Sequence, residues 1–203
     1  MNTRLAVLLG MLAMASSLRA QAPPGWKVRA DDPKADMTKL AFTEMKPGFH
    51  VTTGPAAIFW NPENTATGNF TIESEIFFFR EGSRDTEAYG ILLGGKDLEG
   101  AADYVYFMLR NDGKYLVKHR AGNGDTHLIT DWTQHDAVVM HLGSEGTVKN
   151  VISVAAGADS VRFSVNGKPV SSYPRSHMKA DGIVGLRVNH GLNLHVSKLA
   201  IGK

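Results

Sequence analysis

The sequence contains no cysteine, so no disulfide bond can stabilise the fold that it adopts. A domain of about 180 residues can bury enough apolar surface to be stable without such cross-links. In an exported protein the absence also favours a bacterial source, because extracellular modules of animals commonly carry disulfides. Nor can a lipid be attached to a cysteine behind an export signal. The lack of cysteine therefore predicts a fold that depends on its hydrophobic core.

Acidic residues are missing from the first 22 positions, which divide into three parts. Arg4 provides a positive charge, residues 5–14 are apolar, and residues 20–22 read Ala-Gln-Ala, a small-x-small cleavage sequence. This order is typical of a secretory signal peptide. Two serines and an arginine within residues 16–19 end the apolar run before it reaches the roughly 20 residues of a membrane span. We therefore expect residues 1–22 to be a cleaved signal peptide and the mature protein to be periplasmic or secreted.

The expected mature chain has no excess of either charge. Removal of residues 1–22 takes away Arg4 and Arg19 and no acid, so the 22 Lys and Arg fall to 20, which balance the 20 Asp and Glu. A net charge of zero gives no electrostatic attraction toward nucleic acid or an anionic membrane. No second long apolar stretch follows the signal. We expect no nucleic-acid partner, no membrane insertion, and a glycan or other uncharged ligand as the partner.

Helical periodicity is also missing after residue 36, where apolar residues recur at every second position. Phe70, Ile72, Ile76 and Phe78 are an example, since they alternate with other residues along a single run. Further short runs rich in β-branched and aromatic residues cover 104–110, 115–120, 148–155, 161–165, 183–188 and 194–201. Such runs predict strands that each bury one face.

Turn sequences separate these runs. The clearest are residues 111–113, Asn-Asp-Gly, and residues 166–167, Asn-Gly, because these residue types tolerate the positive φ of tight hairpin turns. We expect about eleven to thirteen strands, no amphipathic helix, and an all-β, antiparallel jelly-roll sandwich of two sheets. Residues 23–36 are predicted to be an N-terminal lead-in with one short strand at 26–29, and residues 37–203 to be a single domain.

Three stretches of the sequence together resemble a known superfamily. They are Tyr104-Val-Tyr-Phe-Met-Leu-Arg-Asn-Asp-Gly-Lys-Tyr-Leu-Val, then Lys149-Asn-Val-Ile-Ser-Val with Val161-Arg-Phe-Ser-Val-Asn-Gly-Lys-Pro-Val, then Asp181-Gly-Ile-Val-Gly-Leu-Arg-Val with Leu194-His-Val-Ser-Lys-Leu. Their order resembles the concanavalin A-like lectin/glucanase superfamily and, within it, LamG-like and 3-keto-disaccharide hydrolase domains. The match covers residues 68–203 well and 37–67 loosely. The resemblance implies a jelly-roll fold and, by analogy, carbohydrate binding.

Catalytic residues are not indicated by this resemblance. The 3-keto-disaccharide hydrolase domains show a Ser-Gly-x-x-x-Arg pattern, where this chain has Tyr-Gly at 89–90 and Gly-Gly at 94–95. The glucanases use E-x-D-x-x-E, where this chain reads E-S-E-I-F-F from Glu73. Glu73 and Glu75 would lie about 6–7 Å apart at Cα on one side of a strand, a spacing that could serve an acid and a base. Because the third carboxylate is absent, we interpret both as solvated glutamates and assign no catalytic residue.

The turn at 111–113 also predicts a ligand-binding face. If the turn has a two-residue loop, Arg110 pairs with Tyr115, and one face of the hairpin carries hydroxyls, a guanidinium and an imidazole. Such a face suits stacking and hydrogen bonding to a sugar. The candidate ligand-binding residues are Tyr104, Tyr106, Arg110, Tyr115, His119 and, before a variable loop, Trp132. The alternative is an outer face decorated with tyrosines, and a three-residue loop would shift the register and mix the two faces.

Metal sites are not indicated by the spacing of the histidines. No two of the eight are arranged as His-x-His or His-x3-His, so we interpret them as surface or hairpin residues and predict no cofactor. Calcium is the alternative, because the rim loops of LamG-like sandwiches offer oxygen ligands. The candidate carboxylates, which do not form a compact run, are Asp97, Asp103, Asp125 and Asp131.

These observations favour an exported, non-catalytic, lectin-like protein that binds carbohydrate. One alternative is a glycoside hydrolase of the 3-keto-disaccharide group, which requires groups such as Glu73, Glu75 and His119 to converge in one pocket. Another is a structural or protein-interaction module of the periplasm. That alternative is expected if the tyrosine face is filled by the protein's own side chains or by a loop such as 81–88. Trp60 is interpreted as a core residue.

Overall fold

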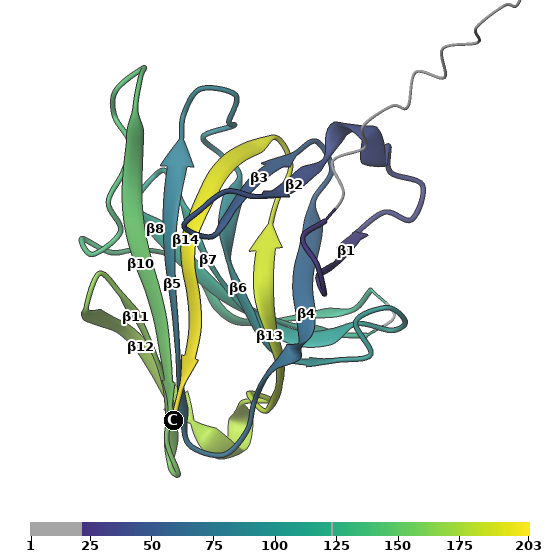
Figure 1. Cartoon of the computed structure of the whole chain (residues 1–203). Coiled ribbons are helices and arrows are strands. Elements are labelled where there is room, and N and C mark those ends of the chain that lie inside the picture. The colour runs from purple at the N-terminus through teal and green to yellow at the C-terminus, as the bar shows by residue number, and fades with distance from the viewer. Residues whose placement is uncertain (1–21, 123) are drawn as a thin grey trace, which may run out of the picture.

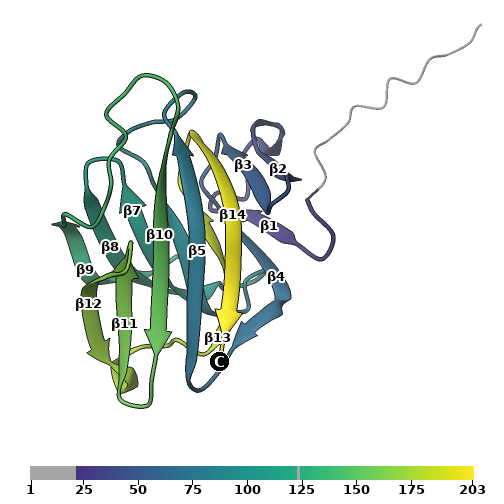
Figure 2. The same cartoon turned by 60° about the vertical axis from the view of Figure 1, so that its left-hand side comes forward.

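Alternating apolar residues fold into two antiparallel sheets that pack face to face (Figure 1, Figure 2). A computed structural model of the chain describes residues 22–122 and 124–203. Sheet A has the strand order β1-β4-β13-β6-β7-β8-β9, and sheet B has the order β12-β11-β10-β5-β14-β3-β2. The expected signal peptide, apart from Ala22, lies outside the described residues.

Each sheet contains seven strands, which are between four and eleven residues long. The strands of sheet A are β1 (Lys27–Ala30), β4 (Ala57–Ala66), β13 (Gly182–Val188), β6 (Ala88–Lys96), β7 (Asp103–Arg110), β8 (Lys114–Ala121) and β9 (Thr126–Gln134). Those of sheet B are β12 (Lys168–Pro174), β11 (Ser160–Val165), β10 (Thr147–Ala156), β5 (Phe70–Phe79), β14 (Leu192–Gly202), β3 (Phe49–Thr53) and β2 (Ala41–Glu44).

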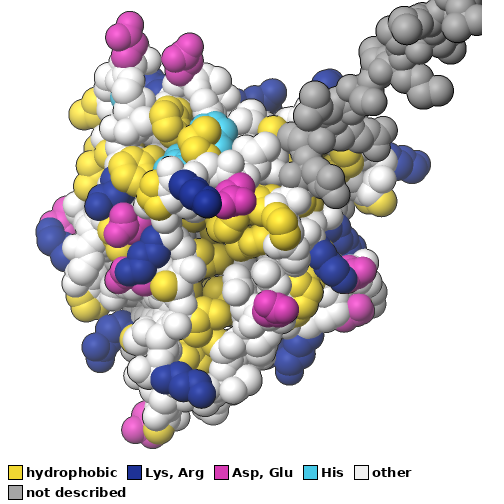
Figure 3. All heavy atoms as spheres, in the orientation of Figure 1, with side chains coloured by type: hydrophobic (Ala, Val, Ile, Leu, Met, Phe, Trp, Pro, Cys, Tyr) yellow, Lys and Arg dark blue, Asp and Glu magenta, His cyan; other side chains and the backbone are white. Residues whose placement is uncertain are grey.

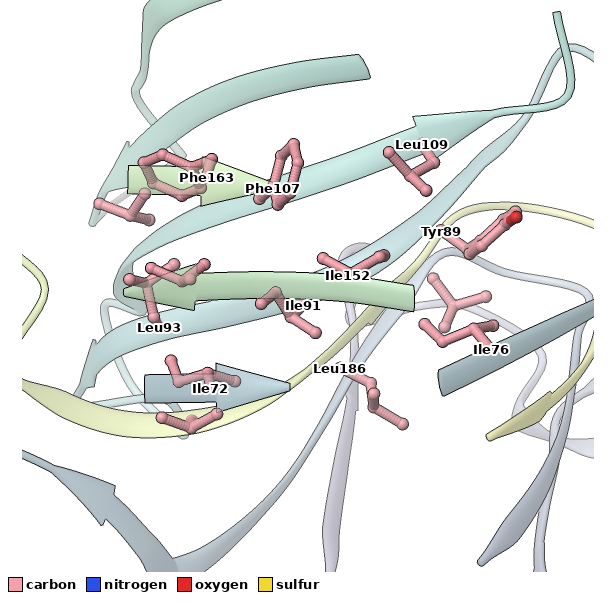
Figure 4. Close-up of a cluster of buried hydrophobic side chains, with 14 of the residues drawn as sticks. Ile72, Ile76, Tyr89, Ile91, Leu93, Phe107, Leu109, Ile152, Phe163 and Leu186 are labelled. Carbon is pink, nitrogen blue, oxygen red and sulfur yellow. The ribbon is translucent and has the colours of Figure 1, made fainter. Parts of the chain in front are cut away.

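The inner faces of the two sheets meet in one large apolar core. Figure 4 shows Ile91 and Phe107 of sheet A among Ile72, Ile152 and Phe163 of sheet B. None of these five side chains is exposed to solvent. The rings of Phe107 and Phe163 meet edge to face with centroids 5.1 Å apart. Burial of a side chain of this size contributes about 1.5–3 kcal/mol, so this layer stabilises the fold without disulfides.

The prediction of an all-β antiparallel jelly-roll sandwich is confirmed. The two sheets contain one strand more than the expected upper limit, and the described helices are two short 3-10 turns, η1 (Met37–Lys39) and η2 (Arg175–His177). Neither is long and apolar enough to cross a membrane. The strand expected in the lead-in is present as β1, which pairs with β4. Residues 27–30 therefore contribute an edge strand to sheet A.

The β7–β8 hairpin differs from the prediction by one residue. Arg110 pairs with Lys114 and not with Tyr115, so the loop contains the three residues 111–113. Gly113 has a φ of +80°, the left-handed conformation that closes three-residue hairpin loops. A shift of one residue turns every side chain of the second strand to the opposite face. The expected grouping of side chains on the two faces of this hairpin is therefore wrong.

Two asparagines, both in the stretches that resemble the lectin/glucanase superfamily, hold the segment after β9 against the sandwich. Asn150, fully buried on β10, accepts from the Val139 amide at 3.0 Å and donates to the Val139 carbonyl at 2.9 Å. Asn166, in the β11–β12 turn, donates to the Ala137 carbonyl and to Asn150 Oδ1, each at 2.8 Å. Buried amides are costly unless they are hydrogen-bonded, so this network fixes residues 137–139.

Candidate functional site

The outer face of sheet A divides into a covered half and an open half. The covered half lies over β1, β4, β13 and β6, where the β6–β7 loop, residues 97–102, folds back onto the sheet. Its Leu98 and Ala102 belong to a second apolar cluster with Ile58, Trp60, Leu92 and Tyr104. Arg29 of β1 donates to the Leu98 carbonyl at 2.9 Å, and Lys27 forms an ion pair with Glu99. The protein's own loop therefore fills this half of the face.

One carboxylate balances several guanidinium groups beside the covered half. Asp31, which follows β1, accepts from Nη1 and Nη2 of Arg187 at 2.6 and 2.5 Å. Arg120 Nη1 lies 3.9 Å from the same carboxylate, and a small crevice is lined by Arg29, Asp31, Tyr104 and Arg120. The Arg187 side chain is only 10% exposed. Removal of Asp31 would therefore leave a buried charge without its counterion.

The open half is formed by β7, β8 and β9, where aromatic and cationic side chains flank the buried apolar pair Met108 and Leu116. Tyr106 lies opposite Lys118, and Arg110 lies opposite Lys114. The Arg110 guanidinium sits over the Trp132 ring, 4.4 Å from its centroid. A cation–π contact of this kind contributes about 0.5–1 kcal/mol at an exposed site. The surface thus offers ring faces together with charged hydrogen-bond donors.

A hollow of about 450 Å³ adjoins the open half at the β7–β8 turn. It is lined by Arg80, Asp85, Thr86, Arg110, Asn111, Asp112, His141 and Leu142. Asp85 accepts from Arg80 at 2.8 Å and from Asn111 at 2.9 Å, and Asp112 accepts from Arg110 at 2.5 Å. Asn111 also donates to the His141 carbonyl at 3.2 Å and accepts from the His141 amide at 2.7 Å, so three separate loops are connected. The hollow is therefore polar and preformed, and its volume falls in the range of small-ligand sites.

The ion pair at the edge of the hollow has a fixed charge state. The hydrogen bond from Arg110 lowers the pKa of Asp112, and the same bond raises the pKa of Arg110. Burial raises the pKa of both Tyr104 and Tyr106. Both phenols are therefore protonated at neutral pH and can act as donors. A ligand on this face meets fixed guanidinium charges and the neutral hydroxyl of Tyr106, since Tyr104 is buried.

Four of the predicted ligand-binding residues lie on the outer face of sheet A. Tyr106, Arg110 and Trp132 are on the open half and are partly exposed. Tyr104 is on the same face but only 1% exposed, because it packs in the apolar cluster with Leu98. The structure therefore brings three of the predicted residues together at an accessible surface.

The other two predicted residues lie on the inner side of sheet A because of the one-residue register shift. Tyr115 is buried in the core, and its hydroxyl donates to the Val170 carbonyl of sheet B at 2.8 Å. His119 Nε2 lies 2.7 Å from Asp103 Oδ1. Both side chains thus take part in contacts within the fold and are separated from Tyr106 and Arg110 by the sheet itself.

Several residues at this surface were not predicted from the sequence. Asp31 comes from the lead-in, and its partner Arg187 lies 156 positions further along the chain, so no local pattern connects them. Asn111 and Asp112 were interpreted only as turn formers. His141 belongs to the segment that Asn150 positions. The Asn-Asp-Gly turn was the available signal, because a turn rich in polar side chains at a strand end can also line a ligand site.

The carboxylates weighed for catalysis lie elsewhere. Glu73 and Glu75 are on the outer face of sheet B, where they form ion pairs with Lys198 at 2.7 Å and Lys149 at 3.6 Å. His119 is on the inner side of sheet A. These three groups do not converge in one pocket, which is the arrangement that the hydrolase alternative requires.

The carboxylates weighed for calcium have other partners or lie apart. Asp97 accepts from the Ala101 amide at 2.8 Å and Asp131 from the Trp132 amide at 2.8 Å. Asp103 contacts His119 and accepts from Lys179 at 2.8 Å. Burial raises the pKa of Asp103, but hydrogen bonds from Lys179 and His119 outweigh it and lower that pKa overall. Within residues 22–122 and 124–203, no group of three or more His, Asp or Glu could hold a metal ion.

Comparison with known proteins identifies the fold. No protein-family model and no curated protein sequence matches the chain. Among solved structures, carbohydrate-binding module CBM66 from Bacillus subtilis is similar, with a TM-score of 0.64 and 11% identity over 88% of this chain and 96% of that one. A Bacillus subtilis protein of unknown function with a galectin-like fold gives a TM-score of 0.59 and 9% identity over 87% and 88% of the two chains.

A third similar structure is the GH16 protein of the Bacteroides ovatus mixed-linkage glucan locus, solved in complex with a G4G4G3G product. Its TM-score is 0.58 at 8% identity, over 87% of this chain and 94% of that one. These likenesses show a two-sheet jelly-roll fold, which is the fold implied by the resemblance to the concanavalin A-like lectin/glucanase superfamily. The narrower resemblance to LamG-like or 3-keto-disaccharide hydrolase domains stays a prediction.

Proposed function

We propose that this protein binds carbohydrate through the open half of sheet A and the adjoining hollow, without catalysing a reaction. The observation that carries the proposal is the stack of Arg110 on Trp132 at an accessible surface, which also carries Tyr106 four residues earlier on the same strand face. Aromatic rings present apolar faces that match the C–H faces of sugar rings, and the polar groups around them can bond sugar hydroxyls. Arg110 belongs both to this surface and to the hollow.

The fold supports the same proposal at a coarser level. Similar structures include a carbohydrate-binding module and a GH16 protein with a bound glucan product. Fold likeness at about 10% identity does not transfer a ligand, so the residues of the open half carry the argument. The covered half contributes rigidity, because residues 97–102 pack against the sheet.

Glycan-array screening of the full chain as the cell produces it tests this function. Variants Tyr106→Ala, Arg110→Ala and Trp132→Ala are compared with Phe77→Ala, a partly exposed aromatic residue on the outer face of sheet B. We expect the first three variants to lower the affinity for the glycan about tenfold or more, because truncation of an aromatic or Arg anchor costs about 1–3 kcal/mol of binding free energy. Phe77→Ala should leave the affinity unchanged. Absence of binding to every glycan would refute the proposal.

We further propose that the protein acts outside the cytoplasm, in the periplasm or the medium. The tripartite organisation of residues 1–22 supports this location. Cell fractionation followed by N-terminal sequencing tests it, with Pro23 expected as the first residue. A protein that keeps Met1 and stays in the cytoplasmic fraction would contradict it.

A second candidate function is a protein-interaction module, favoured by one exposed apolar segment. Leu142 is 78% exposed and Val139 47% exposed, close to the rim of the hollow. Apolar side chains gathered in this way are typical of binding surfaces. Val139→Ser, outside the lining of the hollow, should then abolish a protein contact measured by cross-linking in the cell, while glycan binding stays unchanged. Loss of glycan binding with the protein contact intact would instead assign this segment to the glycan site.

A further inference from the structure

We infer that the glycan bound at the open half is acidic, carrying carboxylate or sulfate groups. This inference rests on the proposed function and specifies its ligand class. Its basis is the distribution of charge over the outer face of sheet A, which differs strongly from the zero net charge expected of the mature chain. A neutral total predicted an uncharged ligand, but recognition depends on the local surface.

Two carboxylates on this face are each shared between two cations. Asp31 lies within 4 Å of both Arg187 and Arg120. At the other end, Asp112 contacts Arg110 at 2.5 Å and Lys114 at 3.4 Å. Two positive groups around one negative group leave a local excess of positive charge at both ends of the hairpin.

The cations follow one strand across the open half. Lys114, Lys118 and Arg120 all lie on the outer side of β8, opposite Arg110, Tyr106 and Tyr104. By strand geometry, their Cα atoms are separated by roughly 13 and 7 Å. A linear polymer with a charge on successive sugar units can contact several such cations at once. A neutral polymer would displace the hydration of these cations without adding negative charge to balance the local excess.

Arg120, at the end of this row of cations, borders the crevice beside Tyr104, which has no room for a ligand group. Arg29 and Arg120 line this crevice with Asp31, and Arg120 Nε has no hydrogen-bond partner among the described residues. The Arg120 side chain is only 18% exposed. Electrostatic attraction is stronger where water is partly excluded, so an acid group at the outer edge of Arg120 gains more than one beside a fully exposed cation.

The test compares acidic polymers with neutral polymers that share their backbone. Polygalacturonate is paired with its methyl ester for carboxylate, and dextran sulfate with dextran for sulfate; affinity for the full chain is measured by affinity electrophoresis. Lys118→Glu and Arg120→Gln are the site variants. Lys149→Gln and Lys198→Gln, on the outer face of sheet B, are matched controls for non-specific attraction. Thermal unfolding checks that Arg120→Gln is folded, and Lys118→Glu gives a second, independent site variant.

We expect at least one acidic polymer to bind about tenfold or more tightly than its neutral partner, and binding to weaken as salt rises from about 0.05 to 0.5 M. Lys118→Glu should lower that affinity about tenfold, while the two control variants leave it unchanged. Equal affinity for the acidic and neutral polymers would overturn the acidic ligand but keep carbohydrate binding. An equal loss of affinity in the site variants and the control variants would show that the acidic polymer does not bind at the open half of sheet A. Failure to bind these polymers and every other glycan would remove both the inference and the proposed function.

Discussion

The outer faces of the two sheets use charge in opposite ways. On sheet B, Glu73 is paired with Lys198 and Glu75 with Lys149, one cation for each acid, with side chains between 31% and 47% exposed. In Figure 3, which has β10, β5 and β14 in front, Lys or Arg spheres lie next to Asp or Glu spheres on this face. On sheet A the Asp31 carboxylate is shared by two cations, and one of them, Arg187, is almost buried. A neutral chain can therefore have one balanced face and one cationic face.

The aromatic residues differ between the faces as well. On sheet B, Phe77 and Phe79 lie against His195 and His50, with ring centroids 6.0 and 5.7 Å apart. A cation lies over a ring on each face, but Lys149 Nζ is 6.0 Å from the Phe77 centroid on sheet B, whereas the Arg110 guanidinium is 4.4 Å from the Trp132 centroid on sheet A. A cation fixed over a ring offers donors and an apolar surface at one place, which suits a polar ligand. This difference between the faces supports the proposal that the binding site lies on sheet A.

The largest effect is expected from Asp31→Asn, which removes the only carboxylate that contacts Arg187 among the described residues. Breaking a buried ion pair from one side leaves an uncompensated charge, so we expect a loss of about 2–4 kcal/mol in the free energy of unfolding, measured with urea. The double variant Asp31→Asn with Arg187→Met should recover part of the loss. If the free energy of unfolding of Asp31→Asn were within about 0.5 kcal/mol of the wild-type value, the ion pair on sheet A would behave like an exposed pair, as on sheet B.

Alkaline pH should lower the free energy of unfolding, mainly because of tyrosines in sheet A, which carries four of the five. Burial raises the pKa of Tyr89 to about 12, against 10.0 for a tyrosine that is free of the fold. The unfolded chain therefore releases this proton first, so the stabilisation is complete below pH 10 and is lost as pH rises toward 12. The loss attributable to Tyr89 is about 2–3 kcal/mol. Urea unfolding across this range and the tyrosinate absorbance provide the measurements.

The control for this pH dependence is Tyr89→Phe. The variant should be less stable at neutral pH, because Asn150 loses a hydrogen-bond partner at 3.1 Å, but its stability should fall less steeply above about pH 10. An unchanged slope would mean that other groups produce the alkaline loss.

A smaller effect is expected from Arg110→Ala on the open half of sheet A. The variant loses the ion pair with Asp112 and the contact with Trp132, which together contribute about 1 kcal/mol at a partly exposed site. The fluorescence of Trp132 should shift to longer wavelength as water reaches the ring. The shift is assigned to Trp132 if Arg110→Ala causes no such shift in a protein that also carries Trp132→Phe. Lys168→Ala, which removes an exposed ion pair with Asp136, is the matched control. A Trp132 spectrum that does not change would show that the stack is not formed in solution.

The sequence was sufficient to predict the fold and only part of the site. Alternation of apolar residues predicts strands directly, and the turns at 111–113 and 166–167 were placed correctly. The register of the β7–β8 hairpin was predicted wrongly, because residues 111–113 suit both two- and three-residue loops. The choice between the two loops depends on how Tyr115 packs between the sheets. Whole-chain charge likewise carries no information about which side of a sheet each cation lies on. Asp31 and Arg187 meet only through tertiary structure.

The smallest effect is expected on the outer face of sheet B. Glu73→Gln and Lys198→Gln each break an ion pair whose side chains are 45% and 47% exposed, so solvent already screens the attraction. We expect each variant to change the free energy of unfolding by less than about 0.5 kcal/mol. Because the pair is balanced, replacing both residues together should matter no more than replacing one. A loss comparable to that of Asp31→Asn would mean that exposure does not separate the two faces, and would contradict the charge difference on which the proposed binding surface of sheet A rests.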